Sequence, residues 1–229
     1  MIKPLLTLFL PLFFTCSAIA EAPYPDPERF RQNIEQFLAQ ENTARPPKNA
    51  IVALGSSSML GWHERIAEDL APLSIIPRGF GGSNMYDARY FLKELVLRHK
   101  PRAVMLYEGD NDAALGASTE QVMQHFIAIV HTLHTELPDT RLYIFAVKPS
   151  IARWNIWPAM LNINEALKSF SETDPLITYV DVATPMLGDD GRPIESIFVA
   201  DMLHMNDRGY DIWRDAVRPV VYAAEKSFE

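Results

Sequence analysis

Five short apolar runs recur along the chain, and each is followed by a longer segment of mixed polarity. The runs occupy residues 51–54, 74–76, 103–107, 142–147 and 177–182. Runs of this length, bounded by turn residues, predict strands, and their nearly continuous apolar character predicts burial on both faces.

Between these runs, apolar positions return every three or four residues, which predicts amphipathic helices. Two helices also carry a start signal, because Ser118 and Gln121 form a capping-box pattern and Asn206 can cap the last helix. The predicted helical segments are residues 30–38, 62–70, 85–99, 122–137, 157–170 and 210–221.

The alternation of strands and helices predicts the fold class: a three-layer α/β/α sandwich with a five-stranded, mainly parallel sheet. The chain has 229 residues, which suits one domain, over residues 49–229, better than two. In such a sheet, binding and catalytic groups gather at the carboxyl ends of the strands.

Residues 1–20 have the three parts of a secretory leader: an early Lys3, an apolar run, and small residues ending at Ala20. An uncleaved membrane anchor is the alternative, but the run is short for a span that needs roughly 20 residues. We therefore expect cleavage after Ala20, no stable membrane span afterwards, and a periplasmic or secreted protein. Residues 21–48, rich in proline and charge, are predicted to form a lead-in helix and linker.

The cysteine count and the net charge exclude several kinds of site and partner. The single cysteine, Cys16, lies inside the predicted leader, so the mature chain would have no disulfide, zinc–thiolate site or cysteine nucleophile. The net charge is −8, and removal of Lys3 leaves 20 basic against 29 acidic residues, or −9. A surface this acidic repels phosphate backbones, which argues against nucleic acid as a partner.

Polar and glycine-rich segments follow the predicted strands. They are, in order, residues 55–58 (GSSS), 78–84 (RGFGGSN), 108–112 (EGDND), 148–150 (KPS) and, beyond the fifth strand, 201–204 (DMLH). Because parallel strands place their carboxyl ends at one edge of the sheet, we expect these segments to converge there.

The converging residues include the parts of a serine nucleophile. A serine hydroxyl is activated when a histidine accepts its proton and a carboxylate orients that histidine. Asp201 and His204 are three residues apart, so one loop can deliver both groups. A glycine N–H such as that of Gly82, and the Asn111 side chain, could stabilise an oxyanion.

From the residues alone, other interpretations stay open. Any of Ser56, Ser57 and Ser58 could be the nucleophile. The same loop could instead hold a phosphate in a non-catalytic, flavodoxin-like binding protein. A catalytically silent, glycan-binding protein is a further alternative. The H-x-x-H pair of His131 and His134 lacks a third ligand, so we interpret it as helix surface.

Four blocks in this order resemble the SGNH hydrolases, also called GDSL esterases and lipases, which are serine-dependent ester hydrolases. The resemblance spans about residues 51–221. The blocks are Gly55-Ser56-Ser57, Gly82 within GFGGSN, Gly109-Asp110-Asn111, and Asp201-Met202-Leu203-His204.

The resemblance implies that Ser57 is the nucleophile, His204 the general base and Asp201 the carboxylate that orients it. It implies that Gly82 and Asn111, together with the Ser57 backbone N–H, donate hydrogen bonds to the oxyanion. An acyl-enzyme on Ser57 follows from these roles, and neither a metal nor a cofactor is required.

One block departs from the family. Its usual Asp before the nucleophile is Ser56 here. The departure leaves the triad complete but makes the three serines harder to tell apart. We expect Ser56 to bond the backbone of the turn and Ser58 to cap the following helix.

The substrate is less sharply indicated. No long apolar insertion is evident that would hold a long acyl chain, so we expect short acyl esters, such as acetyl esters, of small molecules, lipids or glycans. Trp154 and Trp157 follow the fourth strand and could stack on a sugar or line the acyl pocket. Packing of a long loop is the alternative for both.

Overall fold

The computed structural model describes residues 24–229, so the predicted leader lies outside the described residues. Five strands form one sheet in the order β2-β1-β3-β4-β5, and every neighbouring pair is parallel. The predicted fold class is therefore confirmed. The strands are β1 (Ile51–Gly55), β2 (Ile75–Gly79), β3 (Ala103–Tyr107), β4 (Arg141–Phe145) and β5 (Ile177–Val180).

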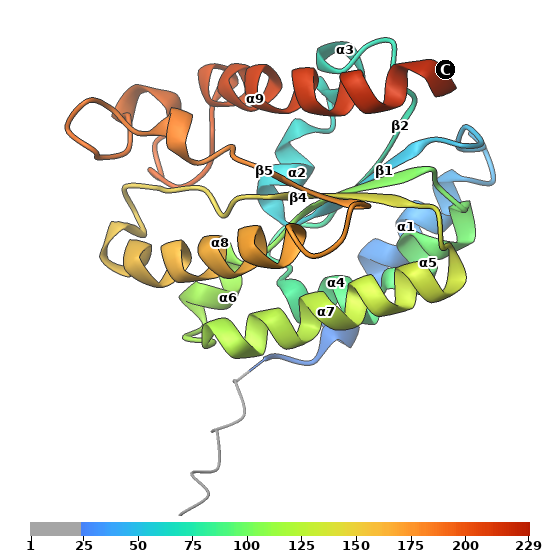
Figure 1. Ribbon diagram of the computed structural model, residues 1–229, viewed down its shortest axis with the longest axis horizontal. Coiled ribbons are helices and arrows are strands. Elements are labelled where there is room, and N and C mark those ends of the chain that lie inside the picture. Colours follow the sequence, from blue (N-terminus) through green and yellow to red (C-terminus); the bar gives the residue numbers. More distant parts are fainter. Residues whose placement is uncertain (1–23) are drawn as a thin grey trace, which may run out of the picture.

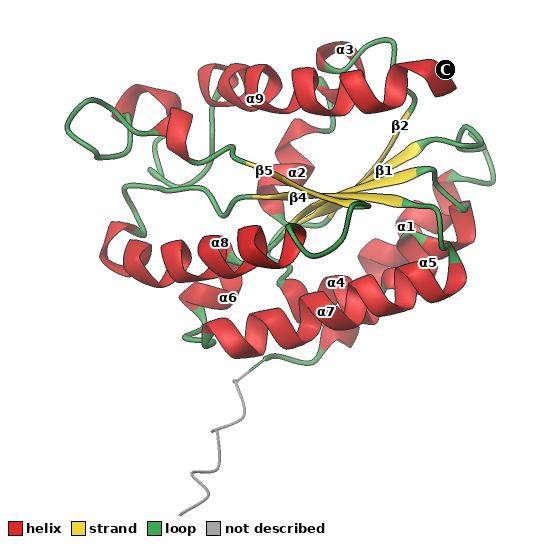
Figure 2. Cartoon of the chain, viewed as in Figure 1, coloured by secondary structure: helices red, strands yellow, loops and turns green. Residues whose placement is uncertain are grey.

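Helices cover both faces of this sheet (Figure 1, Figure 2). Helices α2, α3 and α9 lie on one face, and α4, α5, α7 and α8 lie on the other. The α-helices are α1 (Arg31–Gln40), α2 (Ser57–Trp62), α3 (Ile66–Asp69), α4 (Met85–Tyr90), α5 (Leu92–Leu95), α6 (Asp110–Ala114), α7 (Thr119–Glu136), α8 (Trp157–Ser171) and α9 (Asp207–Glu225). Short 3-10 turns occupy Pro27–Phe30, Leu97–His99, Trp154–Ile156, Thr184–Met186, Glu195–Ile197 and Lys226–Phe228.

The predicted helix starts are confirmed. The Ser118 side chain accepts the backbone N–H of Gln121 and the Gln121 side chain accepts that of Ser118, which makes the capping box at α7. The Asn206 side chain accepts two backbone N–H groups in the first turn of α9. Each cap satisfies donors that have no partner inside the helix.

The continuous helix predicted over residues 85–99 was wrong. This segment is divided into α4, α5 and a 3-10 turn. At the first break the backbone of Phe91 leaves the helical region, with ψ at 11°, and its fully buried ring meets Phe80 edge to face. Core packing of this ring overrides the local helical pattern, as tertiary contacts often do.

The lead-in segment packs closely against the rest of the domain. Ile34 of α1 is completely buried in the main core. Arg29 donates two hydrogen bonds to the buried carboxylate of Asp87 at the start of α4. The Tyr24 hydroxyl donates to Asp112 on α6 at 2.8 Å. The lead-in therefore braces the two helices that follow β2 and β3.

An aromatic cluster holds α9 against the sheet and α2. Trp213 of α9 is fully buried, and its ring lies 5.7 Å from Trp62, 4.9 Å from Tyr107 and 5.8 Å from Phe145. One turn earlier, the Tyr210 hydroxyl donates to the Ser58 carbonyl at 3.0 Å. Since α9 follows directly on the 201–204 segment, this cluster fixes that segment relative to the serine turn.

The end of β2 is held against α2 by a neutral histidine. The N–H of Gly79 donates to His63 Nε2 at 2.8 Å. A Cβ at Gly79 would lie 2.3 Å from the backbone nitrogen of Leu60, so only glycine allows this approach. Burial, and secondly the charge of Arg78, lowers the pKa of His63 from 6.5 to about 4.

This histidine predicts a specific pH dependence of stability. The folded-state pKa of His63 lies below the unfolded value of 6.5, so the unfolded chain binds the proton more tightly. Stability is then lost as the pH falls from 6.5 toward 4. We expect wild type to lose about 2 kcal/mol more than His63→Gln between pH 7 and pH 5. Urea unfolding at both pH values measures this, and equal losses would contradict it.

Candidate active site

The turn between β1 and α2 presents Ser57 as the first residue of α2. Ser56 occupies the N-cap position in an extended conformation, but its side chain makes no capping bond. Ser58 lies inside the first turn and is buried, and its carbonyl accepts the Tyr210 hydroxyl. The capping role predicted for Ser58 was therefore wrong, because the helix begins two residues earlier than that role requires.

The structure brings the three predicted triad residues together. Ser57 Oγ lies 2.9 Å from His204 Nε2, across 147 residues of sequence. His204 Nδ1 lies 2.6 Å from Asp201 Oδ2. This is the hydrogen-bonded chain of hydroxyl, imidazole and carboxylate that can activate a serine.

A tight turn holds Asp201 and His204 in this geometry. Asp201 Oδ1 accepts the backbone N–H groups of Leu203 and His204, each at 2.9 Å. The His204 ring contributes most, and these N–H groups next, to a pKa of Asp201 well below its ordinary value. Met202 adopts a left-handed conformation with φ at 57°, and its carbonyl accepts the N–H of Ala152. The carboxylate is thus charged and fixed on the imidazole.

The loop after β2 passes beside Ser57. A Cβ placed on Gly81 would lie 3.9 Å from the Ser57 Cβ. Gly82 follows with φ at 87°, a conformation that favours glycine. Within residues 24–229, the backbone N–H groups of Ser57 and Gly82 donate to no other protein group. Both remain available for an oxyanion.

Asn111 enters the site from α6. Its Nδ2 donates to the Ser83 carbonyl at 2.7 Å, and its Oδ1 accepts from Arg153 at 3.0 Å. An amide nitrogen carries two hydrogens, so one remains for the oxyanion. Gly109, with φ at 115°, lets the chain turn into α6, and a Cβ there would lie 2.6 Å from a methyl group of Val147.

Buried carboxyl groups lie behind the loops that follow β2 and β3, and no role was predicted for them from the sequence. Glu108 is fully buried and accepts the Ser83 hydroxyl at 2.6 Å. Burial, and secondly the charge of Asp112, raises the pKa of Glu108 well above its ordinary value, which keeps it neutral. Asp112 accepts the N–H of Met85, and burial raises its pKa to about 6. The sequence EGDND shows that these residues are acidic, but it does not show which of them are buried.

The two tryptophans have different surroundings. Trp157 is the first residue of α8 and is buried. Trp154 is half-buried and stacks on it, with ring centroids 5.9 Å apart. Only Trp154 lines a cavity of about 420 Å³. The other lining residues are Ile151, Gly188, Asp190, Arg192, Pro193, Ile194 and Glu195.

This cavity borders the turn that carries the histidine. Ile151 lines it, and the next residue, Ala152, donates its N–H to the Met202 carbonyl at 3.0 Å. The loop over residues 188–195 supplies most of the remaining wall. No local sequence pattern connects this loop to the site.

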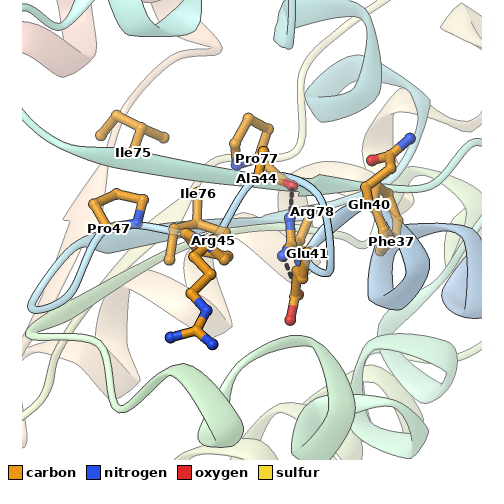
Figure 3. Close-up of a pocket in the computed structure, with 11 residues that line it drawn as sticks. Phe37, Gln40, Glu41, Ala44, Arg45, Pro47, Ile75, Ile76, Pro77 and Arg78 are labelled. Atoms are coloured by element: carbon orange, nitrogen blue, oxygen red, sulfur yellow. Dashed lines mark hydrogen bonds and ion pairs between the residues drawn. The ribbon is translucent and has the colours of Figure 1, made fainter.

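A second cavity, of about 290 Å³, lies beside the edge strand β2 (Figure 3). It is lined by the end of α1, the following loop and the first residues of β2, and Glu41 pairs with Arg78 there at 2.5 Å. Its lining follows β2 from Ile75 to Arg78 and includes no residue of the serine turn, of the loop after β2 or of the histidine turn. We therefore assign it no part in the site.

The described residues were also examined for metal-binding clusters and membrane-spanning helices. Among residues 24–229, no group of three His, Cys, Asp or Glu side chains is placed to hold a metal ion. His134 contacts the Thr140 carbonyl and Asp174 instead. None of the helices in the described part of the chain is both long and apolar enough to cross a membrane.

Comparison with known proteins gives a family match and several structural relatives. The model of the GDSL-like lipase/acylhydrolase family matches residues 43–212, which include Ser57, Gly82, Asn111, Asp201 and His204. The chain has no match among curated proteins.

The structural relatives share this fold at low sequence identity. A GDSL-like lipase from Bacteroides thetaiotaomicron is 18% identical with a TM-score of 0.72, covering 84% of this chain and 98% of the lipase. A Geobacillus acetyl-xylooligosaccharide esterase is 13% identical with a TM-score of 0.61, covering 75% and 93%. A carbohydrate esterase of family 3 from Talaromyces cellulolyticus is 15% identical with a TM-score of 0.60, covering 78% and 99%.

The geometry of the Asp201 turn predicts the effect of removing its charge. Asp201→Asn keeps an oxygen for the two backbone N–H groups but cannot stabilise a protonated imidazole in the same way. We expect kcat for p-nitrophenyl acetate to fall by about 10³- to 10⁴-fold while the urea midpoint stays unchanged. A kcat within about threefold of wild type would show that His204 does not depend on this carboxylate.

Proposed function

The chain belongs to the GDSL-like lipase/acylhydrolase family and is a carboxylic ester hydrolase, and we propose that it cleaves short acyl esters, chiefly acetyl esters of glycans, through an acyl-enzyme on Ser57. The proposal rests above all on the pair of hydrogen bonds that joins Ser57 to His204 and His204 to Asp201.

The first half of the reaction forms the acyl-enzyme. His204 Nε2 accepts the Ser57 proton as Oγ attacks the acyl carbonyl. Asp201 holds the ring in the tautomer that leaves Nε2 free to accept, because Nδ1–H donates to its carboxylate. The imidazolium then gives the proton to the departing alcohol oxygen.

The second half releases the acid. Water takes the place of the alcohol, His204 accepts one of its protons, and the resulting oxygen attacks the acyl carbon. The bond to Ser57 Oγ breaks, and Oγ takes the proton back from the imidazolium. No metal or cofactor enters this sequence of steps.

In both halves the carbonyl oxygen becomes an oxyanion. Three donors surround its position in the proposal: the backbone N–H groups of Ser57 and Gly82 and the free Nδ2 hydrogen of Asn111. Donors fixed before the reaction need not reorganise as charge develops, which is why such sites contribute strongly to rate.

The connections around Ser57 support a short acyl group. One residue, Ser56, separates β1 from α2, and two residues separate β3 from α6. Neither connection has the length to form a lid over a long chain. Leu60 is 43% exposed and approaches Gly81 on the side of the loop that faces Ser57. A small acyl group can contact it without an enclosed tunnel.

The cavity next to the histidine turn supports a hydroxyl-rich alcohol portion. Its wall combines the Trp154 ring with Asp190, Arg192 and Glu195. Carboxylates and a guanidinium can bond sugar hydroxyls, and an indole can cover the apolar side of a sugar ring. The two esterases named above act on acetyl-xylooligosaccharide or belong to a carbohydrate esterase family, which agrees with this assignment.

The proposal predicts which of the adjacent serines is essential. Ser57→Ala should lower kcat by about 10⁴-fold or more, since a triad without its nucleophile retains only residual catalysis. Ser58→Ala, matched in chemistry and adjacent in sequence, should keep kcat within about tenfold. Hydrolysis of p-nitrophenyl acetate and labelling by a fluorophosphonate probe measure both. Labelled, active Ser57→Ala protein would overturn the assignment.

The glycan part of the proposal has its own test. Trp154→Ala should raise KM for acetylated xylo-oligosaccharides by about 10-fold or more, because the cavity loses its largest apolar wall. KM for p-nitrophenyl acetate, whose alcohol portion carries no sugar, should change less than about twofold. Equal KM changes on both substrates would mean that the cavity does not bind the glycan.

A further inference from the structure

Three charged side chains form a connected series of contacts that begins at Asn111: Arg153, Asp110 and Lys148. Arg153 Nη1 donates to Asn111 Oδ1 at 3.0 Å and also to Asp110 Oδ1. Asp110 Oδ2 lies 3.7 Å from Lys148 Nζ. Lys148 Nζ donates to the Leu203 carbonyl at 2.7 Å, inside the turn that carries His204. The reaction described above assigns no role to these three charged residues.

From this arrangement we infer that Arg153 is a positioning residue for the oxyanion donor: it fixes and polarises the Asn111 amide. The inference rests on the proposed function, in which Asn111 donates to the oxyanion. It concerns a residue that neither the triad nor the oxyanion loops include.

The contact with Arg153 fixes which way the Asn111 amide faces. The two ends of an amide side chain differ in chemistry, since the oxygen only accepts and the nitrogen only donates. Arginine has donors only, so its contact selects the Asn111 oxygen. With Oδ1 on Arg153 and one Nδ2 hydrogen on the Ser83 carbonyl, the second hydrogen has one direction left. An amide turned the other way would place an oxygen against the oxyanion.

The charge of Arg153 also polarises the Asn111 amide. A cation that bonds the amide oxygen draws electron density from the nitrogen and strengthens its N–H as a donor, because hydrogen-bond chains polarise one another. Arg153 also places its positive charge at the oxygen end of the Asn111 amide. A cation at that end favours a negative oxygen at the nitrogen end.

The Arg153 side chain is itself held in place by its neighbours. Asp110 is 7% exposed and Arg153 is 20% exposed, and the Arg153 backbone N–H donates to Ser150 Oγ at 3.2 Å. Lys148 is completely buried and connects Asp110 to the Leu203 carbonyl. A surface arginine would move freely, whereas this one is held between the β3 and β4 loops.

A role in binding an anionic part of the substrate would also use an arginine at this place. The two roles differ on a neutral substrate. With p-nitrophenyl acetate there is no anion to bind, so loss of a binding role would leave kcat unchanged. Loss of the positioning role lowers kcat on this ester and leaves KM nearly unchanged, because the oxyanion forms only in the transition state.

The test is a double-mutant cycle on p-nitrophenyl acetate. Arg153→Met keeps an unbranched apolar stem but removes the guanidinium with its donors and charge. We expect kcat to fall about 10- to 100-fold with KM within about twofold, less than the roughly 10²- to 10³-fold loss for removal of a whole oxyanion donor. In the Asn111→Ala background, the same Arg153→Met change should lower kcat less than about twofold, because its target is gone.

The controls separate positioning from general damage. Arg153→Lys keeps the charge and one donor and should recover part of kcat. If Arg153→Met does not fold, judged by its urea midpoint, the cycle is run with Arg153→Lys. Arg214→Met, which removes an arginine paired with Asp211 and Asp215 on α9, should leave kcat unchanged.

Two outcomes would overturn the inference: a wild-type kcat for Arg153→Met, or equal losses in the presence and absence of Asn111. The result for Ser57→Ala keeps this failure distinct from failure of the proposed function. If Ser57→Ala is inactive and Arg153→Met is fully active, only the role of Arg153 is wrong. If Ser57→Ala is active, the proposed function itself fails.

Discussion

The hydrogen bond between Ser57 and His204 joins two segments that are 147 residues apart, and much of the fold holds its two ends in place. The serine end is set by β1, whose buried strand stops at the turn into α2. The histidine end is set by α9, which begins three residues after His204 and is packed on α2 and the sheet through Trp213. A bond of 2.9 Å tolerates little movement, so both supports must be rigid.

The buried charges around the site fall into two groups with different effects. Glu108 and Asp112, behind the β2 and β3 loops, have raised pKa values because burial disfavours their charged forms. Asp110, by contrast, has two cations beside it, Arg153 and Lys148. Burial thus limits negative charge at Glu108, whereas the carboxylate of Asp110 is paired with basic side chains.

The lead-in residues extend the domain beyond the range matched by the family model, which begins at residue 43. Arg29 pairs with Asp87 and Tyr24 bonds Asp112, so the helices after β2 and β3 are both tied to the start of the described chain. Of the proposed oxyanion donors, Asn111 lies on α6 and Gly82 lies in the loop that leads into α4. The segment is therefore joined to the site through buried carboxylates rather than through exposed contacts.

The sequence by itself determined the class of fold, the order of its strands along the chain and the segments that form the site. It could do so because burial on both faces of a sheet leaves an apolar run, and because parallel strands bring their carboxyl ends to one edge. The resemblance of four blocks then selected Ser57 among three like serines. These features are local or follow from a general rule of sheet geometry.

Only the tertiary structure decided how the polar groups around these residues are paired. The start of α2 at Ser57, the break at Phe91, the neutral Glu108 and the link from Lys148 through Asp110 to Arg153 each depend on neighbours distant in sequence. A buried side chain adopts the charge and direction that its surroundings permit, and no single segment encodes those surroundings. The cavity at Trp154 depends in the same way on the 188–195 loop, which is more than 30 residues away in the sequence.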